Sequence, residues 1–186
     1  FSIEKRSIRH YAPAVGAHKL GDECDVNQTN IDSDSYYQPG DYIGKLGVER
    51  SYEKVLRGEK GLRIMLRDVH GRTKGHYMNG AYDKLPVPGQ NITLGVDLKT
   101  QELAERLLQG KIGAIVAIEP STGQFLCMAS SPSYDPGIMV GRDRSKAHEA
   151  LSKNPRKPLL NRAIMGTYPP GSTLKISPAL LGLQEG

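Results

Sequence analysis

A serine and a lysine three residues apart, Ser172 and Lys175, lie in the segment "YPPGSTLK" near the C-terminus. If a helix begins near Ser172, as the Pro-Pro-Gly lead-in allows, residues i and i+3 face the same side and their side chains can meet. A serine hydroxyl at its own pKa is a poor nucleophile, and a lysine whose pKa is lowered by desolvation or nearby cations can take its proton. The pattern therefore suits acyl transfer, with Ser172 as the nucleophile and Lys175 as the general base.

The same two residues also have a simpler interpretation. Ser172 can cap the N-terminus of a helix, and Lys175 can lie on the exposed face of that helix. S-x-x-K is a short pattern that occurs by chance in many proteins, so the spacing alone favours this simpler interpretation. The surrounding sequence has to decide between the two.

The longer segment "LNRAIMGTYPPGSTLK" resembles the segment that carries the active-site serine in class B penicillin-binding proteins, a family in which S-x-x-K is an established motif. Upstream, "GAIVAIEPSTGQFLCMASSPSYDPG" resembles the opening hairpin of the family's transpeptidase domain. "GDYIGKLGVERSYEKVLRGEKG" resembles the helix and strand that close its non-catalytic pedestal domain. "RSIRHY" and "VHGRTKG" are similar to pedestal segments of the elongation-type branch.

This resemblance implies an α+β fold in two parts. Residues 1–110 would be a pedestal, or dimerisation-type, domain that is incomplete at its N-terminus. Residues 111–186 would be the opening hairpin and the active-site-serine segment of a transpeptidase domain that is incomplete at its C-terminus. Carried over by position, Ser172 is the acylated nucleophile and Lys175 its base, while the substrate-binding residues stay unassigned.

The activity that the resemblance implies is that of a peptidoglycan D,D-transpeptidase in cell-wall elongation, which cross-links stem peptides through an acyl-enzyme and is acylated by β-lactams. No metal and no organic cofactor is implied. The implied partners of the pedestal are a membrane glycan polymerase and a cell-shape scaffold protein. The implied location is the periplasmic side of the inner membrane, with an anchor helix that is absent from this sequence.

The family's later motifs, S-x-N and K-T-G, normally follow the serine, and neither follows Ser172 here. "SKN" at 152–154 precedes the serine, and we interpret it as a coincidence in a polar loop. "STG" at 121–123 has no lysine before it and reads as a hairpin turn. We therefore expect these 186 residues alone to be catalytically inactive.

Two alternatives from other classes stay open. The chain can be a non-catalytic interaction module of the cell-wall synthesis complex, or a relative of the serine β-lactamases and β-lactam sensors, which share S-x-x-K. The pedestal-like half argues against a lactamase, because those enzymes are usually compact single units. Septal relatives share the closing motif, and only "RSIRHY", "GDYIG" and "VHGR" favour the elongation branch.

The composition excludes several other functions. The net charge is +5, with 25 basic and 20 acidic residues, but the basic residues are dispersed, so nucleic acid is not an expected partner. Two cysteines and five histidines show no metal-ligand spacing, and Cys127 lies in an apolar run typical of a buried position. No apolar stretch approaches the 18 or more residues of a membrane span.

Apolar periodicity predicts helices over residues 47–58 and 98–109. Asp97 can cap the second helix, while Gly58 and Gly110 can end the two helices in a left-handed conformation. The predicted apolar faces are Val48, Tyr52, Val55 and Leu56 in the first helix, and Leu103, Ala104, Leu107 and Leu108 in the second. Pro178, inside the closing helix, would remove one backbone hydrogen bond there.

Strands are predicted over residues 62–67 and 92–96, and a hairpin is predicted with strands at 113–119 and 124–130. The hairpin strands are apolar at nearly every position, so we expect cover on both faces, with at least one helix packed there. Residues 137–160 are polar, with little periodicity, and read as a surface excursion.

Overall fold

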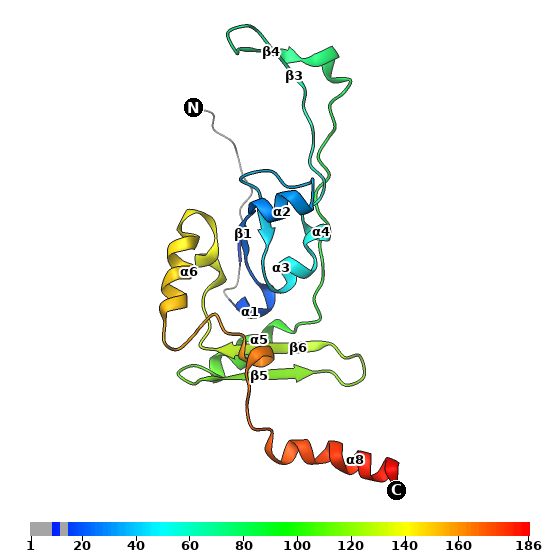
Figure 1. Cartoon of the computed structure of the whole chain (residues 1–186), viewed down its shortest axis with the longest axis vertical. Helices are drawn as coiled ribbons and strands as arrows, with labels where there is room; N and C mark the ends of the chain where they lie inside the picture. The colour runs from blue at the N-terminus through cyan, green and yellow to red at the C-terminus, as the bar shows by residue number, and fades with distance from the viewer. Residues whose placement is uncertain (1–8, 12–14) are drawn as a thin grey trace.

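The computed structural model describes residues 9–11 and 15–186 of the chain (Figure 1). Short helices and strands mix along the chain, which confirms the α+β class. In order they are α1 Ala17–Leu20, β1 Glu23–Asp25, α2 Gln28–Ser33, β2 Tyr42–Gly44, α3 Gly47–Ser51, α4 Glu53–Leu56, β3 Met65–Arg67, β4 Thr73–His76, η1 Tyr77–Gly80, α5 Leu98–Leu107, β5 Gly113–Ile118, β6 Phe125–Ser131, η2 Pro136–Met139, η3 Gly141–Asp143, α6 Arg144–Lys153, α7 Arg162–Met165, η4 Gly171–Lys175 and α8 Ile176–Glu185.

The described strands form three separate antiparallel pairs, β1 with β2, β3 with β4 and β5 with β6. The pairs are spread along an elongated molecule (Figure 1). The β3–β4 pair lies at one end, the β1–β2 pair lies in the middle among α1 to α4, and the β5–β6 pair lies below it beside α5. Helix α8 stands at the opposite end.

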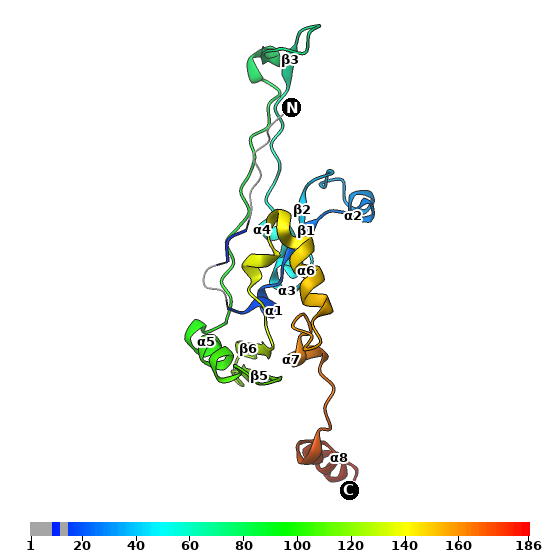
Figure 2. The same cartoon turned by 90° about the vertical axis from the view of Figure 1, so that its left-hand side faces the viewer.

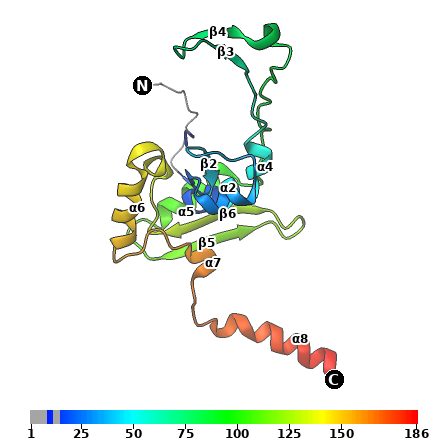
Figure 3. The ribbon, with the colours of Figure 1, turned by 45° about the horizontal axis from the view of Figure 1, so that its top comes forward.

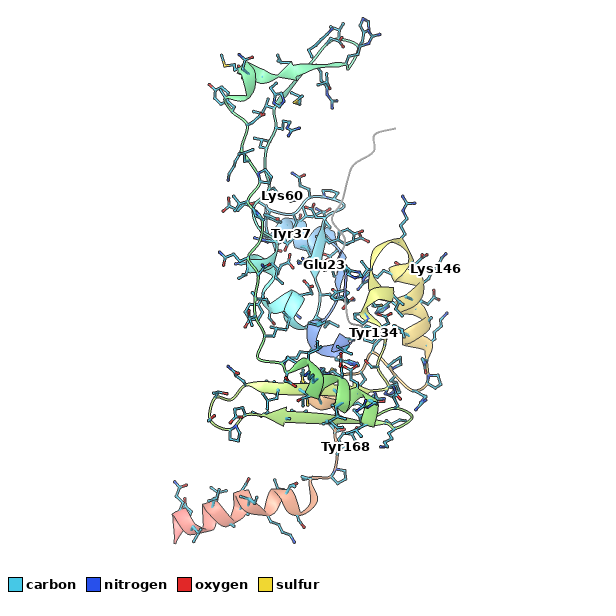
Figure 4. The ribbon with its side chains drawn as sticks, turned by 180° about the vertical axis from the view of Figure 1, so that it is seen from behind. Glu23, Tyr37, Lys60, Tyr134, Lys146 and Tyr168 are labelled. Atoms are coloured by element: carbon cyan, nitrogen blue, oxygen red, sulfur yellow. The ribbon has the colours of Figure 1, made fainter. Side chains whose placement is uncertain are left out.

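The predicted hairpin is present, with Gly113 paired to Ser131 at its open end and Ile118 paired to Phe125 near its turn. Helix α5 packs on one face, where its residues share a core with β6. The four-residue α7 lies on the other face (Figures 1 and 4). Because α7 is so short, Val116 and Ile118 stay 42% and 50% exposed. The predicted cover on both faces of the hairpin is therefore only partial on the α7 side.

Helix α5 agrees with the sequence at both ends. The side chain of Asp97 accepts a hydrogen bond from the backbone N–H of Thr100 at 2.7 Å, and Gly110 follows the helix at φ +74°. The predicted apolar face is correct only for Ala104 and Leu108, since Leu103 and Leu107 are exposed.

The predicted helix over residues 47–58 is broken. Tyr52, at φ −114° and ψ 17°, separates α3 from α4. Tyr52 and Val55, from the predicted apolar face, are exposed, whereas the acidic Glu49 is buried. Glu49 is buried because Arg9 and Tyr11 lie beside its carboxylate, and the periodicity of the segment cannot show such distant partners. Gly58 does end α4, at φ +67°.

Residues 59–88 form a long two-stranded arm that leaves the body beside α4 (Figure 1). Only Met65–Arg67 of the predicted strand over 62–67 enter a ladder, and the arm buries few of its apolar side chains. At its base the ammonium of Lys60 lies 4.7 Å from the centre of the Tyr36 ring, close to Tyr37 (Figure 4). The strand predicted over 92–96 is wrong, because that segment has no regular structure.

Residues 137–160 are mostly exposed, as a surface excursion should be, but they contain α6, which the sequence did not predict. Met139 and Tyr134 are buried against Ala17, and the partly buried residues Ala147, Leu151 and Leu159 complete this second core. Ala147 and Leu151, four residues apart, are the only apolar side chains of α6 in it, so the helical stripe was too narrow to recognise.

Candidate active-site segment

Ser172 and Lys175 both lie in the single 3₁₀ segment η4. A 3₁₀ helix has three residues per turn, so side chains at i and i+3 come to the same side. The structure therefore gives the two residues the spacing that the sequence predicts. Both are exposed, and no hydrogen bond joins their side chains in the part of the chain that the structure describes.

Ser172 is not a helix cap. Pro170 occupies the N-cap position of η4, Gly171 follows at φ +56°, and Ser172 is the second residue of the segment. The hydroxyl that bonds back to the chain is that of Thr173, which donates to the carbonyl of Pro170. The simpler interpretation of the serine as a cap is therefore wrong in this structure.

Pro178 is the third residue of α8. Lys175 and Ile176, on either side of the boundary between η4 and α8, are both right-handed helical, so the two segments form one continuous helical run. Pro178 has no N–H and cannot donate to the Leu174 carbonyl one turn earlier, which is the bond loss expected from the sequence.

The segment before η4 is tied closely to the hairpin. Asn161 caps α7 by accepting a hydrogen bond from the N–H of Ala163 at 3.1 Å. Arg162 is only 8% exposed, and its guanidinium donates to the carbonyl oxygens of Arg156 at 2.7 Å and Lys157 at 3.0 Å. The sequence did not single out Ser130, whose hydroxyl accepts from the backbone N–H of Arg162 at 3.0 Å.

His18 contacts the same region from the N-terminal part of the chain. Its Nε2–H donates to the carbonyl of Pro158 at 2.8 Å, and its ring meets the Tyr134 ring edge to face at 5.4 Å. Burial lowers the pKa of His18, against the opposing effects of the Pro158 carbonyl and of Glu105. Burial raises the pKa of Tyr134 to about 12, so this contact is neutral at physiological pH.

The two other serine motifs lie in elements other than η4. Ser152 is in the last turn of α6, and Ser121 is in the β5–β6 turn, where it donates to Glu119 at 2.8 Å. Among the described residues, no three His, Cys, Asp or Glu side chains form a metal site, and both cysteines are free thiols. No helix of the described chain is long and apolar enough to cross a membrane.

Two protein families match the sequence. Residues 1–94 match the penicillin-binding protein dimerisation domain, and residues 113–186 match the penicillin-binding protein transpeptidase domain. Residues 95–112 fall between the two matches, so the predicted division after residue 110 stays a prediction.

Curated relatives cover nearly the whole chain. The peptidoglycan D,D-transpeptidase MrdA of Escherichia coli K12 is 40% identical over 188 residues, which is 98% of this chain and 29% of the relative. MrdA of Acinetobacter baumannii is 39% identical over 99% of this chain and 27% of the relative. The chain thus spans less than a third of the length of these relatives.

Solved structures agree with the fold. PBP2 of Pseudomonas aeruginosa, in complex with WCK 5153, has a TM-score of 0.77 at 39% identity, over 96% of this chain and 36% of that chain. PBP2 of Helicobacter pylori, in complex with MreC, has a TM-score of 0.80 at 29% identity, over 94% and 32%. A peptidoglycan synthase complex that coordinates polymerization and crosslinking has a chain with a TM-score of 0.74 at 31% identity, over 96% and 33%. This chain therefore belongs to the class B penicillin-binding proteins and is PBP2/MrdA-like, with a dimerisation-domain segment followed by the first part of a transpeptidase domain.

Proposed function

We propose that Ser172 is the acylated nucleophile of a peptidoglycan D,D-transpeptidase in cell-wall elongation and that Lys175 is its general base. The observation that carries this proposal is the placement of both residues on one 3₁₀ turn, inside the segment that matches the transpeptidase family. The identity to MrdA over nearly the whole chain supports the same reaction class.

In this reaction Lys175 Nζ accepts the hydroxyl proton of Ser172 as Oγ attacks the carbonyl carbon between two terminal D-alanines of a stem peptide. The C–N bond breaks, the last D-alanine leaves with a proton, and an ester joins the stem to Ser172. An amine of a neighbouring stem then attacks the ester and forms the cross-link, the ester C–O bond breaks, and a proton lost by that amine goes to the serine oxygen. A β-lactam acylates the same oxygen because its strained amide replaces the peptide bond.

The environment of η4 explains why the 186 residues alone are expected to be inactive. Helix α8 extends away from the hairpin and from α6, so η4 stands clear of the body (Figure 3). Ser172 and Lys175 are exposed, and the described residues neither desolvate the amine nor wall off a substrate site. Acyl transfer of this kind needs a desolvated amine and an enclosed substrate site.

The test is covalent labelling with a fluorescent penicillin, followed by mass mapping of the adduct. We expect labelling of Ser172 in the protein expressed from the complete reading frame that contains this sequence, and no labelling of the 186-residue chain. Ser172→Ala and Lys175→Ala should abolish labelling, while Ser152→Ala, in the unrelated "SKN", should not. A full-strength adduct in Ser172→Ala would refute the assignment.

The same experiment separates a transpeptidase from a β-lactamase. A lactamase releases its acyl group quickly by hydrolysis, whereas a penicillin-binding protein retains it. We expect the label on Ser172 to persist for many minutes after free penicillin is removed. Rapid loss of the label, with steady penicillin hydrolysis, would favour the lactamase alternative.

We also propose that residues 1–94 bind other proteins of the cell-wall complex, namely a cell-shape scaffold protein and a membrane glycan polymerase, on the periplasmic side of the inner membrane. One observation favours this role. The arm over residues 59–88 leaves Leu62, Leu66 and Val69 exposed on a two-stranded ribbon that projects from the body (Figure 1). The relative from Helicobacter pylori is in complex with MreC, and the third solved relative belongs to a synthase complex.

Binding can be tested with a purified MreC-type scaffold domain. We expect Leu66→Asp, on the arm, to weaken binding, because it places a charge on an apolar contact surface. Lys146→Asp, on the exposed face of α6, makes a comparable change elsewhere on the molecule (Figure 4) and should leave binding unchanged. Equal binding by both variants would exclude the arm as the contact surface.

A further inference from the structure

Arg162 is a buried cation whose polar contacts are backbone carbonyls. Its guanidinium reaches the carbonyl oxygens of Arg156 at 2.7 Å, Lys157 at 3.0 Å and Leu160 at 3.4 Å. In the described part of the chain no carboxylate forms an ion pair with it. Burying a charge without a counter-ion is costly, and here the carbonyl dipoles of one loop offset that cost. The backbone of the loop that precedes α7 therefore surrounds the Arg162 guanidinium.

The loop is held in a strained shape. Lys157 has φ +49°, a left-handed conformation that residues with a Cβ rarely adopt, and it directly precedes Pro158. A residue before proline is normally extended, so the strain has two sources. Such a conformation persists where its surroundings over-determine it. The bond from Arg162 to the Lys157 carbonyl is one such constraint, and the bond from His18 to the Pro158 carbonyl is another.

Ser130 joins the same loop to strand β6 by hydrogen bonds. This serine is 4% exposed, its hydroxyl donates to the carbonyl of Leu160 at 3.1 Å, and it accepts from the N–H of Arg162 at 3.0 Å. Both backbone groups flank the start of α7. The position of α7 on the hairpin is therefore fixed by polar bonds at its first residue, and not only by apolar packing.

The connector from α7 to η4 is short and stiff. It comprises residues 166–170, with Pro169 and Pro170 fixing two of its five φ angles (Figure 2). At its start Gly166 donates to the carbonyl of Arg162 at 3.2 Å, and a Cβ at Gly166 would lie 2.5 Å from that oxygen and 2.6 Å from the Tyr168 ring. The direction in which the chain leaves α7 is therefore fixed next to Arg162. Because the connector is stiff, this direction also determines where Ser172 lies.

We infer that Arg162 is a positioning residue for Ser172. It holds the loop over residues 154–161, fixes α7 on β6 together with Ser130, and so determines where the Ser172–Lys175 turn begins. This inference rests on the proposed function, because it assigns Arg162 a role in placing the proposed nucleophile.

The test measures the two stages of acylation by a fluorescent penicillin in the protein expressed from the complete reading frame. Non-covalent affinity, the acylation rate constant and the final labelled fraction are obtained separately from the time courses. Arg162→Ala should lower the acylation rate constant by roughly tenfold or more, since displacements near 1 Å in a positioned group can cost about a hundredfold. Arg162→Lys keeps the charge but loses the planar fork, so it should recover only part of the rate.

Ser130→Ala provides a second variant in case Arg162→Ala does not fold, and it should also lower the rate constant. Arg142→Ala, which removes an exposed arginine from η3, should react like the parent. A purely structural role of Arg162 predicts a smaller labelled fraction with an unchanged rate constant, and that result would overturn the inference alone. If the parent protein carries no label, the proposed function fails, and the inference fails with it.

Discussion

Gln101 is a buried amide that joins helix α5 to strand β6. It is 2% exposed. Its Oε1 accepts from the backbone N–H of Met128 at 2.8 Å, and its Nε2 donates to the Met128 carbonyl at 3.1 Å and to Glu105 at 2.8 Å. The side chain thus pairs with Met128 as a neighbouring strand would. We predict that Gln101→Leu destabilises this unit strongly, although leucine is the better residue for an apolar stripe.

The size of the effect follows from the groups left behind. The substitution removes two bonds to a backbone that is largely buried, and an unpaired buried donor or acceptor costs about 1–3 kcal/mol. Leucine regains part of this through apolar contact with the core around Ala104 and Cys127. We therefore expect a net loss of about 2–4 kcal/mol in the local free energy of unfolding, near the upper end for single substitutions.

Native-state hydrogen exchange measures this loss directly. The amides that pair β5 with β6 report opening of the hairpin and α5, whether or not other parts of the protein unfold. A loss of about 2–4 kcal/mol corresponds to exchange about 30 to 1000 times faster. Gln109→Leu is the matched control, because Gln109 is exposed just beyond the same helix, and its substitution should change exchange little.

A small effect of Gln101→Leu would contradict a role for this side chain in holding β6. If Gln101→Leu speeds exchange less than about threefold, or no more than Gln109→Leu does, the Met128 backbone does not depend on the glutamine. In that case the geometry would be accidental, and apolar packing of α5 would hold the hairpin by itself. Gln101→Glu gives a second check, since it keeps the shape but cannot donate to the Met128 carbonyl.

Substitutions at three further positions test other contacts. Burial lowers the pKa of His18 below its usual 6.5. The neutral ring therefore stabilises the fold above pH 6.5, and this stabilisation is lost as the pH falls through the lowered pKa. An equal fall of the thermal unfolding midpoint in the parent and in His18→Gln between about pH 7 and pH 5 would contradict this. Arg144→Leu should lower the free energy of unfolding, measured by chemical denaturation, by about 3–5 kcal/mol, because it leaves the buried carboxylate of Asp22 unpaired. A loss below about 1 kcal/mol would argue against a stabilising role of the pair. Lys157→Gly should be more stable than Lys157→Val by about 1–3 kcal/mol, because only glycine adopts the left-handed conformation without strain; equal stability of the two would show that the turn is relaxed.

The parts of the fold that the sequence predicted correctly depend on neighbours along the chain. The cap at Asp97, the left-handed Gly110 and the β5–β6 turn all involve residues a few positions apart. The same holds for the spacing of Ser172 and Lys175, which lies within a single turn. These local features do not depend on distant parts of the molecule, so residue types and their spacing were sufficient to predict them.

The parts that the sequence did not predict depend on distant polar partners. Gln101 and Glu49 are polar and do not belong to the predicted apolar faces of their helices, yet both are buried. Their partners, Met128 and Arg9, are 27 and 40 residues away, and nothing in a 3.6-residue period shows such contacts. Arg162 is buried as well, and its acceptors are backbone carbonyl groups, which no sequence pattern reports.

The same distant contacts bear on how the two family segments are related. Segment 15–25 lies within the dimerisation-domain match, yet Ala17 is buried in a core with Tyr134 and Met139 of the transpeptidase match. Arg144 crosses between the segments as well, donating to the carbonyl of Glu23 at 2.7 Å and pairing with Asp22. Separating the two segments would expose this apolar core to water, which costs free energy. We therefore expect α1 and α6 to protect their amides from exchange together, and protection of one without the other would show that the segments open independently.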